Sequence, residues 1–410
     1  MKCKICGEEN CKKHSMFMGK AVSLTEFSGS TPPEVFVGKW NYPNVYTGIL
    51  SPMEHGQTAI MSSPELWHEK KLQIPSILSM RNKLIYGRTQ SNIYKPRDKK
   101  FLPIMQEIAM THKSVSTEFK LKKPVSKNLE RETRAPVIPK AAPLEKARLQ
   151  ENAPVKKKID YLVSDGEVKS APALVELHKS NIPNSSLVKI LSAGLLGLTK
   201  NRKLVPTRWS ITAVDDTVSK EKLPRIKQYQ EISEFIVFTA NYLGNHYNFL
   251  LLPDKWSFEV IEISLGKGGV WQDYESFFPR KKYAESVTGA YYANRLALTE
   301  YLEKIKRQCS CLVIREIRPE YTAPLGVGIL RQTSREAFSL PARKFPTLQD
   351  ALRDIQLRLK QPITNYANRS EILKEFGKQK RINEFFLGLP NVWGGHGYGA
   401  RAGRGDSRNT

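Results

Sequence analysis

Phe235-Ile-Val-Phe-Thr239 opens the part of the chain that determines its architecture, and two similar runs follow it closely: Tyr247-Asn-Phe-Leu-Leu-Leu252 and Trp256-Ser-Phe-Glu-Val-Ile-Glu-Ile263. All three are short and rich in β-branched and aromatic residues, which favours strands. The third alternates apolar and acidic residues with a period of two, so one of its faces is exposed or lines a cleft. These runs predict three consecutive strands.

Helices and further strands are expected on both sides of these runs. The spacing of apolar residues predicts a long helix over 289–308 and a shorter one over 186–197. Strands are expected at 311–317 and 326–331, and helices at Thr347 and Ser370. Cys309 and Cys311 have no Cys or His neighbour at metal-ligand spacing, so they are predicted to be buried thiols. The pattern indicates an α+β fold with a mixed central sheet and flanking helices.

Composition restricts the class of protein. The 410 residues are 40% hydrophobic and 26% charged, which is ordinary for a globular protein, but the net charge is +25. Such an excess indicates a polyanionic partner such as DNA, or a generally basic surface. The sequence has neither a membrane-spanning apolar run nor a signal peptide, so we expect a cytoplasmic protein that binds no membrane.

The composition also predicts where the chain divides. Pro124, Pro136, Pro139, Pro143 and Pro154 interrupt a stretch rich in Lys, Arg and Ala, as in an extended linker or surface strap. The expected units are a zinc knuckle at 1–18, an N-terminal α+β region at 19–119, a basic Pro-rich linker or strap at 120–165, the main α+β domain at 166–376, and a clamp-interaction peptide with a disordered Gly/Arg tail at 377–410.

The N-terminus has the spacing of a metal site. Cys3, Cys6, Cys11 and His14 supply four ligands within twelve residues, and a two-residue spacing lets a pair bind one ion from a single turn. Iron–sulfur ligation is the rival, but His14 as the fourth ligand favours zinc. We expect a structural zinc ion; the alternative is a disordered terminus with incidental cysteines.

Two groups of basic residues are candidates for nucleic-acid binding. The helical segment that starts at Pro64 is followed by a run of cations that includes Arg81 and Arg88, with Tyr86 and Tyr94 available to stack on bases. The alternative is a solvated helix face. The second group lies in 202–216, where Arg202, Lys203, Arg208 and Trp209 suggest phosphate clamping and base stacking.

Residues 202–216 also contain possible catalytic groups. The candidates are Arg208, Ser210, Asp215 and Asp216, with His246 further along the chain. Adjacent aspartates on a strand face opposite ways, so a divalent metal would need a further ligand such as His246, Glu259, Glu262 or Asp273. The alternative is a buried Arg–Asp network that positions strands.

A short motif close to the C-terminus indicates a protein partner. Residues 379–386 fit Gln-x-x-Ile-x-x-Phe-Phe, the pattern of a sliding-clamp (PCNA) interaction peptide. One helical turn would place Ile382, Phe385 and Phe386 on one side as an apolar plug, while Gln379 reaches the rim of a groove. The alternative is that both rings cover the protein's own core.

Leu-Ser-Ala-Gly-Leu-Leu-Gly197, followed by Arg-Lys-Leu-Val-Pro-Thr-Arg-Trp-Ser-Ile-Thr-Ala-Val-Asp-Asp216, resembles the archaeal Nre DNA-repair proteins. The similarity extends to 27–48 and 246–253 and so covers nearly the whole chain. The resemblance implies repair of damaged DNA together with the sliding clamp, and an N-terminal zinc motif. It implies no established reaction.

Three functions remain open at the level of the sequence. The first is a DNA-repair factor recruited by the clamp, which acts on or recognises damaged DNA through a basic site around Arg208. The second is a non-catalytic clamp adaptor. The third is a nucleotide- or metal-dependent enzyme that acts on a small phosphate compound. No nuclease, helicase, ligase or polymerase signature is present, so whether the protein is an enzyme stays open.

Overall fold

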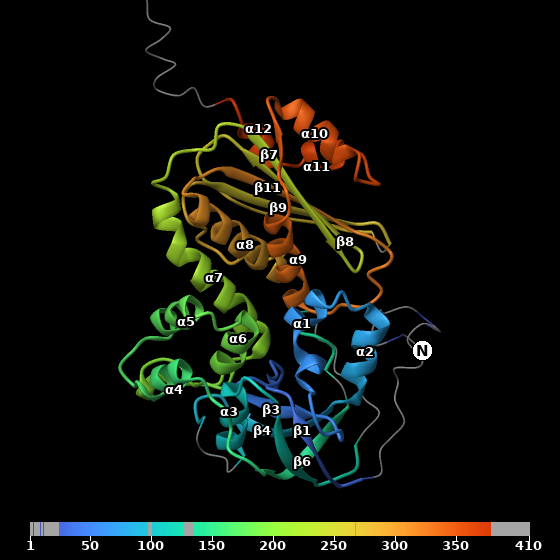
Figure 1. Cartoon of the computed structure of the whole chain (residues 1–410), viewed down its shortest axis with the longest axis vertical. Coiled ribbons are helices and arrows are strands. Elements are labelled where there is room, and N and C mark those ends of the chain that lie inside the picture. The colour runs from blue at the N-terminus through green and yellow to red at the C-terminus, as the bar shows by residue number, and fades with distance from the viewer. Residues whose placement is uncertain are drawn as a thin grey trace, which may run out of the picture.

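The computed structural model describes residues 3, 9, 11, 24–96, 101–125, 134–138, 140–266 and 268–378. Its strands form two six-stranded sheets, one in each half of the molecule, with helices packed around them (Figure 1). The predicted α+β class is therefore confirmed. No helix in the described ranges is long and apolar enough to cross a membrane.

The first sheet is built from the N-terminal part of the chain. Its strand order is β1-β5-β6-β4-β3-β2, and the neighbouring strands are antiparallel except for the short parallel pair β4 and β6. The strands are β1 (Glu26–Thr31), β2 (Val35–Val37), β3 (Asn44–Ser51), β4 (Ile85–Asn92), β5 (Val115–Leu121) and β6 (Ala141–Leu149). Buried and exposed residues alternate along β5, so the sheet has one core face and one solvent face.

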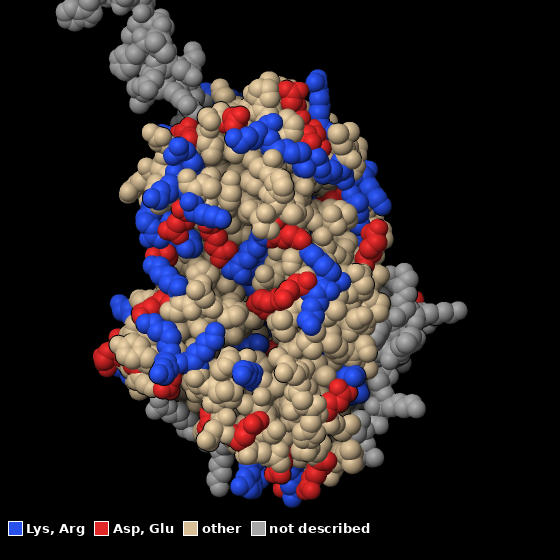
Figure 2. Space-filling view, in the orientation of Figure 1, with Lys and Arg blue, Asp and Glu red and all other residues tan. Residues whose placement is uncertain are grey.

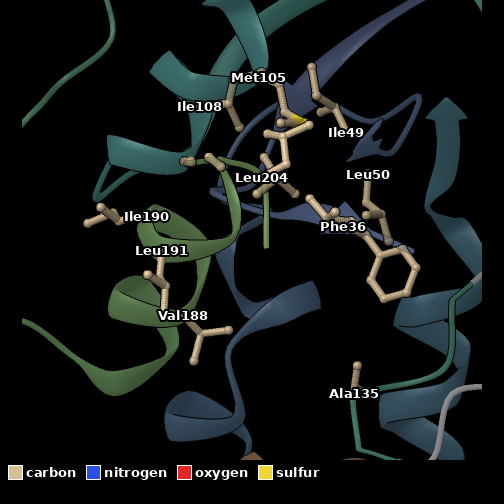
Figure 3. Close-up of a cluster of buried hydrophobic side chains, with 14 of the residues drawn as sticks. Phe36, Ile49, Leu50, Met105, Ile108, Ala135, Val188, Ile190, Leu191 and Leu204 are labelled. Carbon is tan, nitrogen blue, oxygen red and sulfur yellow. The ribbon is translucent and has the colours of Figure 1, made fainter. Parts of the chain in front are cut away.

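Helices α3 and α6 cover the core face of the first sheet. In Figure 3, Ile49 from the sheet lies beside Met105 from α3, and Leu191 from α6 belongs to the same buried cluster. The helical segments are η2 (Ala59–Ser62), α1 (Pro64–Glu69), α2 (Ile74–Lys83), α3 (Leu102–Met110), α4 (Lys157–Ser164), α5 (Ser170–Lys179), α6 (Asn184–Ser192) and η3 (Thr199–Asn201).

The second sheet is mixed, as predicted for the main domain. Its order is β10-β9-β11-β8-β7-β12, with β9 and β11 parallel and the other neighbours antiparallel. The strands are β7 (Phe235–Tyr242), β8 (Asn245–Leu252), β9 (Ser257–Ser264), β10 (Val270–Glu275), β11 (Ser310–Ile317) and β12 (Arg343–Phe345). Almost all of β8, β9 and β11 is buried, because helices cover both faces of the sheet.

Two helices, α8 (Gly289–Ile305) and α9 (Val327–Ser339), cover one face of the second sheet (Figure 1). The short helices α10 (Leu348–Gln356), α11 (Thr364–Ala367) and α12 (Glu371–Glu375) cover the other. Thr347 and Ser370 cap α10 and α12 through their side-chain oxygens, which confirms the predicted helix starts.

The helix α7 (Thr207–Ile226) joins the two halves (Figure 1). At its start, the Thr207 hydroxyl accepts a hydrogen bond from the Val37 backbone N–H of β2, at 2.9 Å. Further along, Asp215 pairs with Arg331 of α9 and Asp216 pairs with Arg295 of α8. Helix α7 therefore contacts the first sheet through Thr207 and the helices of the second half through Asp215 and Asp216.

Several predictions from the sequence are wrong in detail. The segment 120–165 was expected to be a linker or strap, but Ala141–Leu149 is strand β6, paired on both sides inside the first sheet. The strand expected at 326–331 is the start of α9. Asp215 and Asp216, considered as strand residues, lie in helix α7. The single helical segment expected from Pro64 divides into α1 and α2.

Candidate nucleic-acid interface

Large aromatic side chains are exposed at the end of the first sheet. The turn between β2 and β3 carries Trp40 and Tyr42, which are 71% and 45% exposed. Tyr94, just after β4, is 60% exposed, and Trp209, in the first turn of α7, is 44% exposed. Exposed aromatic side chains of this size are costly in water, so a group of them indicates a binding surface.

Three of these side chains form one cluster, which we call the aromatic surface: Tyr42, Tyr94 and Trp209. The ring centroids of Tyr42 and Trp209 are 5.5 Å apart, and the phenol oxygens of Tyr42 and Tyr94 are 3.5 Å apart. The hydrogen bond with Tyr94 raises the pKa of Tyr42 above its ordinary value, which already leaves a phenol neutral at physiological pH. The result is an apolar, uncharged platform.

Backbone contacts hold the parts of the aromatic surface together. The Leu204 N–H donates to the Ile93 carbonyl oxygen at 2.9 Å, which ties the segment before α7 to the segment before Tyr94. The Tyr94 N–H donates to the Asn92 side chain, whose amide in turn donates to Asn44 on the neighbouring strand. Residues distant in sequence are therefore fixed side by side before any ligand arrives.

Cations lie directly over the exposed rings. The Lys203 ammonium is 6.0 Å from the Tyr94 ring centroid, and the Lys39 ammonium is 4.3 Å from that of Trp40. On the adjacent strands, the Arg88 guanidinium is 4.0 Å from the Tyr46 ring. Aromatic rings that stack on bases, placed beside cations that attract phosphates, are the features by which proteins hold single-stranded nucleic acid.

The general charge of the molecule does not locate this site by itself. Figure 2 shows Lys and Arg side chains over both halves on the face it presents, with acidic side chains among them. The contact among three exposed rings from separate segments, with cations beside them, is the feature that marks the end of the first sheet.

The structure separates the predicted nucleic-acid residues into two sets. Lys203, Trp209 and Arg88 belong to or flank the exposed rings, and Arg208 is half-buried next to Trp209 in α7. Arg81 is only 1% exposed and donates to the carbonyl oxygens of Val137 and Met61. Its guanidinium is not accessible to a phosphate backbone in this structure.

Tyr86 and Arg202, predicted to contact bases and phosphates, also bind other parts of the protein instead. Tyr86, proposed to stack on bases, is buried and donates a hydrogen bond to the Phe36 carbonyl oxygen. Arg202 directs its guanidinium at protein carbonyl oxygens, those of Gly197 at 2.9 Å and Asp165 at 2.8 Å. Both side chains therefore hold protein segments together.

Asp215 and Asp216 serve different partners. The Asp215 carboxylate is fully buried and receives two hydrogen bonds from Arg331, at 2.8 and 2.7 Å, and a third from Asn184. Asp216 is partly exposed and pairs with Arg295 and Lys220. The two carboxylates point in different directions from α7 and bind different partners. This arrangement is not that of two ligands of one metal ion.

The other catalytic candidates do not join them. Ser210 is buried inside α7, while His246 is on β8 of the second sheet among Arg318, Glu316 and Glu320, and burial lowers its pKa. Glu259 caps the start of α12, Glu262 pairs with Arg315, and Asp273 pairs with Arg280. Within the described residues, no three His, Cys, Asp or Glu side chains are grouped as a metal site requires.

The zinc and clamp motifs lie largely outside the described residues. Cys3 is buried against Trp67, Ile77 and other apolar side chains of both halves, and Cys11 packs against the same cluster. Cys6 and His14, the other two predicted ligands, are outside the described ranges, as are Gln379, Ile382, Phe385 and Phe386.

Sequence reasoning missed Trp40, Tyr42 and Tyr46. A signal was present, because Lys39-Trp-Asn-Tyr-Pro43 places two large aromatic residues in a polar turn, where packing does not require them. Their proximity to Trp209 could not be derived, since it depends on contacts between segments more than 150 residues apart.

The two sheets and this surface define an α+β protein whose exposed rings and cations suit nucleic-acid bases and phosphates. The chain belongs to the archaeal Nre family: the family description "Archaeal Nre, N-terminal" matches residues 2–272, and "Archaeal Nre, C-terminal" matches residues 275–385.

Named relatives cover most of the chain. It is 32% identical to DNA repair protein NreB of Archaeoglobus fulgidus over 93% of this chain and 97% of that protein. It is 33% identical to DNA repair protein NreA of Haloferax volcanii, over 80% of this chain and 81% of that protein. DNA repair protein NreA of Archaeoglobus fulgidus is 32% identical, over 85% and 90% respectively. No solved structure matches the chain.

Proposed function

We propose that this protein acts in DNA repair, and that it holds unpaired or damaged DNA on its aromatic surface. The relatives that cover most of the chain are DNA repair proteins by name. The observation that carries the proposal is the contact between Trp209, Tyr42 and Tyr94, with Lys203 beside them. Bases stack on such rings without sequence preference, provided that they are unpaired.

The geometry favours single-stranded over duplex DNA. In a duplex the faces of the bases are covered by their neighbours, so only strand ends, flipped bases or gaps can reach a flat platform. Damaged DNA presents such bases more cheaply than intact DNA, because unstacking a mismatched or damaged base costs less. Lys203 and Arg88 would then neutralise the phosphates on either side.

Recruitment by the sliding clamp is the second part of the proposal. Gln379, Ile382, Phe385 and Phe386 carry it through their match to the clamp-interaction pattern. The clamp encircles duplex DNA, so a short peptide would raise the concentration of the aromatic surface near damaged strands.

A structural zinc ion at the N-terminus is a third element. Cys3, Cys6, Cys11 and His14 would hold it, and thiolates with one imidazole suit zinc. Cys3 and Cys11 already lie against one apolar cluster, which brings two of the four ligands to the same part of the fold. Elemental analysis that finds no zinc in the purified protein would remove this part of the proposal.

The aromatic surface is tested by fluorescence anisotropy with a labelled single-stranded oligonucleotide and the matching duplex. We expect tighter binding of the single strand. Trp209→Ala and Tyr42→Ala should each weaken it about tenfold, because stacking contributes about 1–3 kcal/mol per base.

Tyr161→Ala is the matched control. Tyr161 is 62% exposed and has a Lys158 ammonium 5.4 Å from its ring centroid, but it is on α4, outside the aromatic surface. Equal loss of binding in the Tyr161 variant and the Trp209 variant would show that the site is elsewhere.

A further inference from the structure

A charged cavity of about 440 Å³ opens between α7, α8 and the segment after β10. It shares no residue with the aromatic surface. Helix α7 contributes Lys220, the residue just after it is Lys227, α8 contributes Arg295, and the segment after β10 contributes Arg280 and Tyr283. A volume of this size is in the range of pockets for small-molecule ligands.

Positive charge dominates the walls. Six basic side chains line the cavity, Lys220, Lys227, Arg280, Lys281, Lys282 and Arg295, against two carboxylates, Asp216 and Glu275. Both carboxylates are already occupied, since Arg295 pairs with Asp216 and, at 2.9 Å, with Glu275. Arg280 is held by Asp273 at 3.0 Å.

Three lysines remain to face an incoming ligand. Among the described residues, Lys227, Lys281 and Lys282 form no ion pair with a carboxylate. The Lys227 ammonium donates to the Phe277 carbonyl oxygen, and burial lowers its pKa. Glu275 acts on Lys227 only at longer range, so an anion in the cavity would further compensate this partly buried cation, which forms no ion pair among the described residues.

Two tyrosines, Tyr283 and Tyr292, line the same cavity as these lysines. The Tyr283 and Tyr292 rings are stacked, with centroids 4.7 Å apart. Tyr292 is fixed because its hydroxyl oxygen accepts a hydrogen bond from the Ala284 N–H at 2.9 Å, whereas Tyr283 is 42% exposed. The outer face of such a pair offers a flat, preformed surface for another ring.

We propose that this cavity binds a nucleoside phosphate, with the phosphate on Lys227, Lys281 and Lys282 and the base against Tyr283. Lysines supply point charges suited to phosphate, and the tyrosine provides the stacking surface. The nucleoside phosphate is either a free nucleotide or the phosphorylated end of a DNA strand. Only the second source rests on the proposed function.

The test is isothermal titration of the full chain with four probes: adenosine, AMP, a single-stranded oligonucleotide with a 5′-phosphate, and the same oligonucleotide with a 5′-hydroxyl. We expect AMP to bind at least about tenfold tighter than adenosine, or the 5′-phosphorylated strand to bind at least about tenfold tighter than the 5′-hydroxyl strand. Binding of AMP identifies a free nucleotide, and binding of the phosphorylated strand alone identifies a strand end.

The triple variant Lys227→Gln, Lys281→Gln, Lys282→Gln should lose that preference for phosphate, while Lys281→Gln, Lys282→Gln keeps the test valid if the triple variant does not fold. Lys304→Gln is the control, an exposed lysine on α8 outside the cavity. The proposal is overturned if neither phosphate probe is preferred, or if the lysine variants keep the preference. Trp209→Ala should leave it unchanged, which separates this site from the aromatic surface.

Discussion

At the scale of single residues, Asp215 and Asp216 are neighbours in one helix turn but have different surroundings, one buried and one at a cavity. Asp215 is fully buried in a bidentate pair with Arg331, which is the geometry of a structural contact between α7 and α9. Asp216 reaches the edge of a cavity. The sequence left a functional site and a buried Arg–Asp network both open, and the contacts of Asp215 favour the network.

Replacement of Asp215 should therefore act on stability. Asp215→Ala leaves the Arg331 guanidinium buried without its carboxylate, which costs about 3–5 kcal/mol for a buried pair. Urea unfolding followed by circular dichroism measures this change. The control is Asp160→Ala, at an exposed aspartate of α4, which should change stability by less than about 0.5 kcal/mol. A variant of Asp215 with unchanged stability would contradict the structural role.

At the scale of elements, the sequence predicted the parts with a clear pattern and failed where tertiary packing decides. The β7, β8 and β9 runs, the long helix α8 and the buried Cys309 and Cys311 were all predicted correctly. These segments carry apolar residues at the period of their own structure.

Helix α7 shows why other segments failed. It contains β-branched residues such as Ile211, Thr212 and Val214, which usually favour strands, and it packs against α5, α6 and α8, so it lacks a single apolar stripe. Strand β6 was predicted as a linker because it contains Pro143 and several charged residues. Its buried face, which includes Leu144 and Ala147, was not recognised. Of the aromatic surface, only Trp209 and Tyr94 were predicted. Tyr42 was missed because its contacts with them are long-range contacts that form only in the folded protein.

A group of ion pairs ties α5, α7 and α8 together and predicts a pH dependence. Glu221 of α7 pairs with Arg225 and with Lys179 of α5, and Arg225 also pairs with Glu303 of α8. The hydrogen bond with Arg225 is the main cause that lowers the pKa of Glu221 to about 2 from an ordinary value of 4.5. Because the folded pKa is depressed, Glu221 stabilises the fold above pH 4.5, and this contribution is lost as the pH falls towards 2.

The difference in free energy of unfolding between the natural protein and Glu221→Gln should therefore be largest near pH 6 and shrink as the pH falls below 4.5. Denaturant titrations at several pH values measure it. Glu285→Gln, at an exposed glutamate with no ion pair among the described residues, is the control. A difference that stays constant down to pH 3 would refute the contribution of this ion pair.

At the scale of the whole molecule, the proposed function separates recruitment from binding. The predicted clamp-interaction motif at 379–386 and the aromatic surface belong to different parts of the chain, so each can be removed without the other. With both features, the protein would be recruited to DNA by the motif and would contact DNA through the aromatic surface, as two independent steps.

Phe385→Ala with Phe386→Ala should weaken binding to the sliding clamp by about 30-fold or more, since central aromatic anchors contribute about 2 kcal/mol or more to an interface. Surface plasmon resonance on immobilised clamp measures this, with Leu387→Ala, just outside the motif, as the control. Thermal unfolding of the double variant should be unchanged. If the variant unfolds instead, both rings belong to the protein's core.

The most direct measurement of the central claim is photocrosslinking. A single-stranded oligonucleotide with 5-bromodeoxyuridine at successive positions is irradiated in complex with the full chain, and the crosslinked residues are identified by mass spectrometry. Crosslinks concentrated at Trp209, Tyr42 and Tyr94 are the result we predict, because stacked rings hold bases in contact. Crosslinks confined to other parts of the chain would contradict the claim that this surface holds DNA.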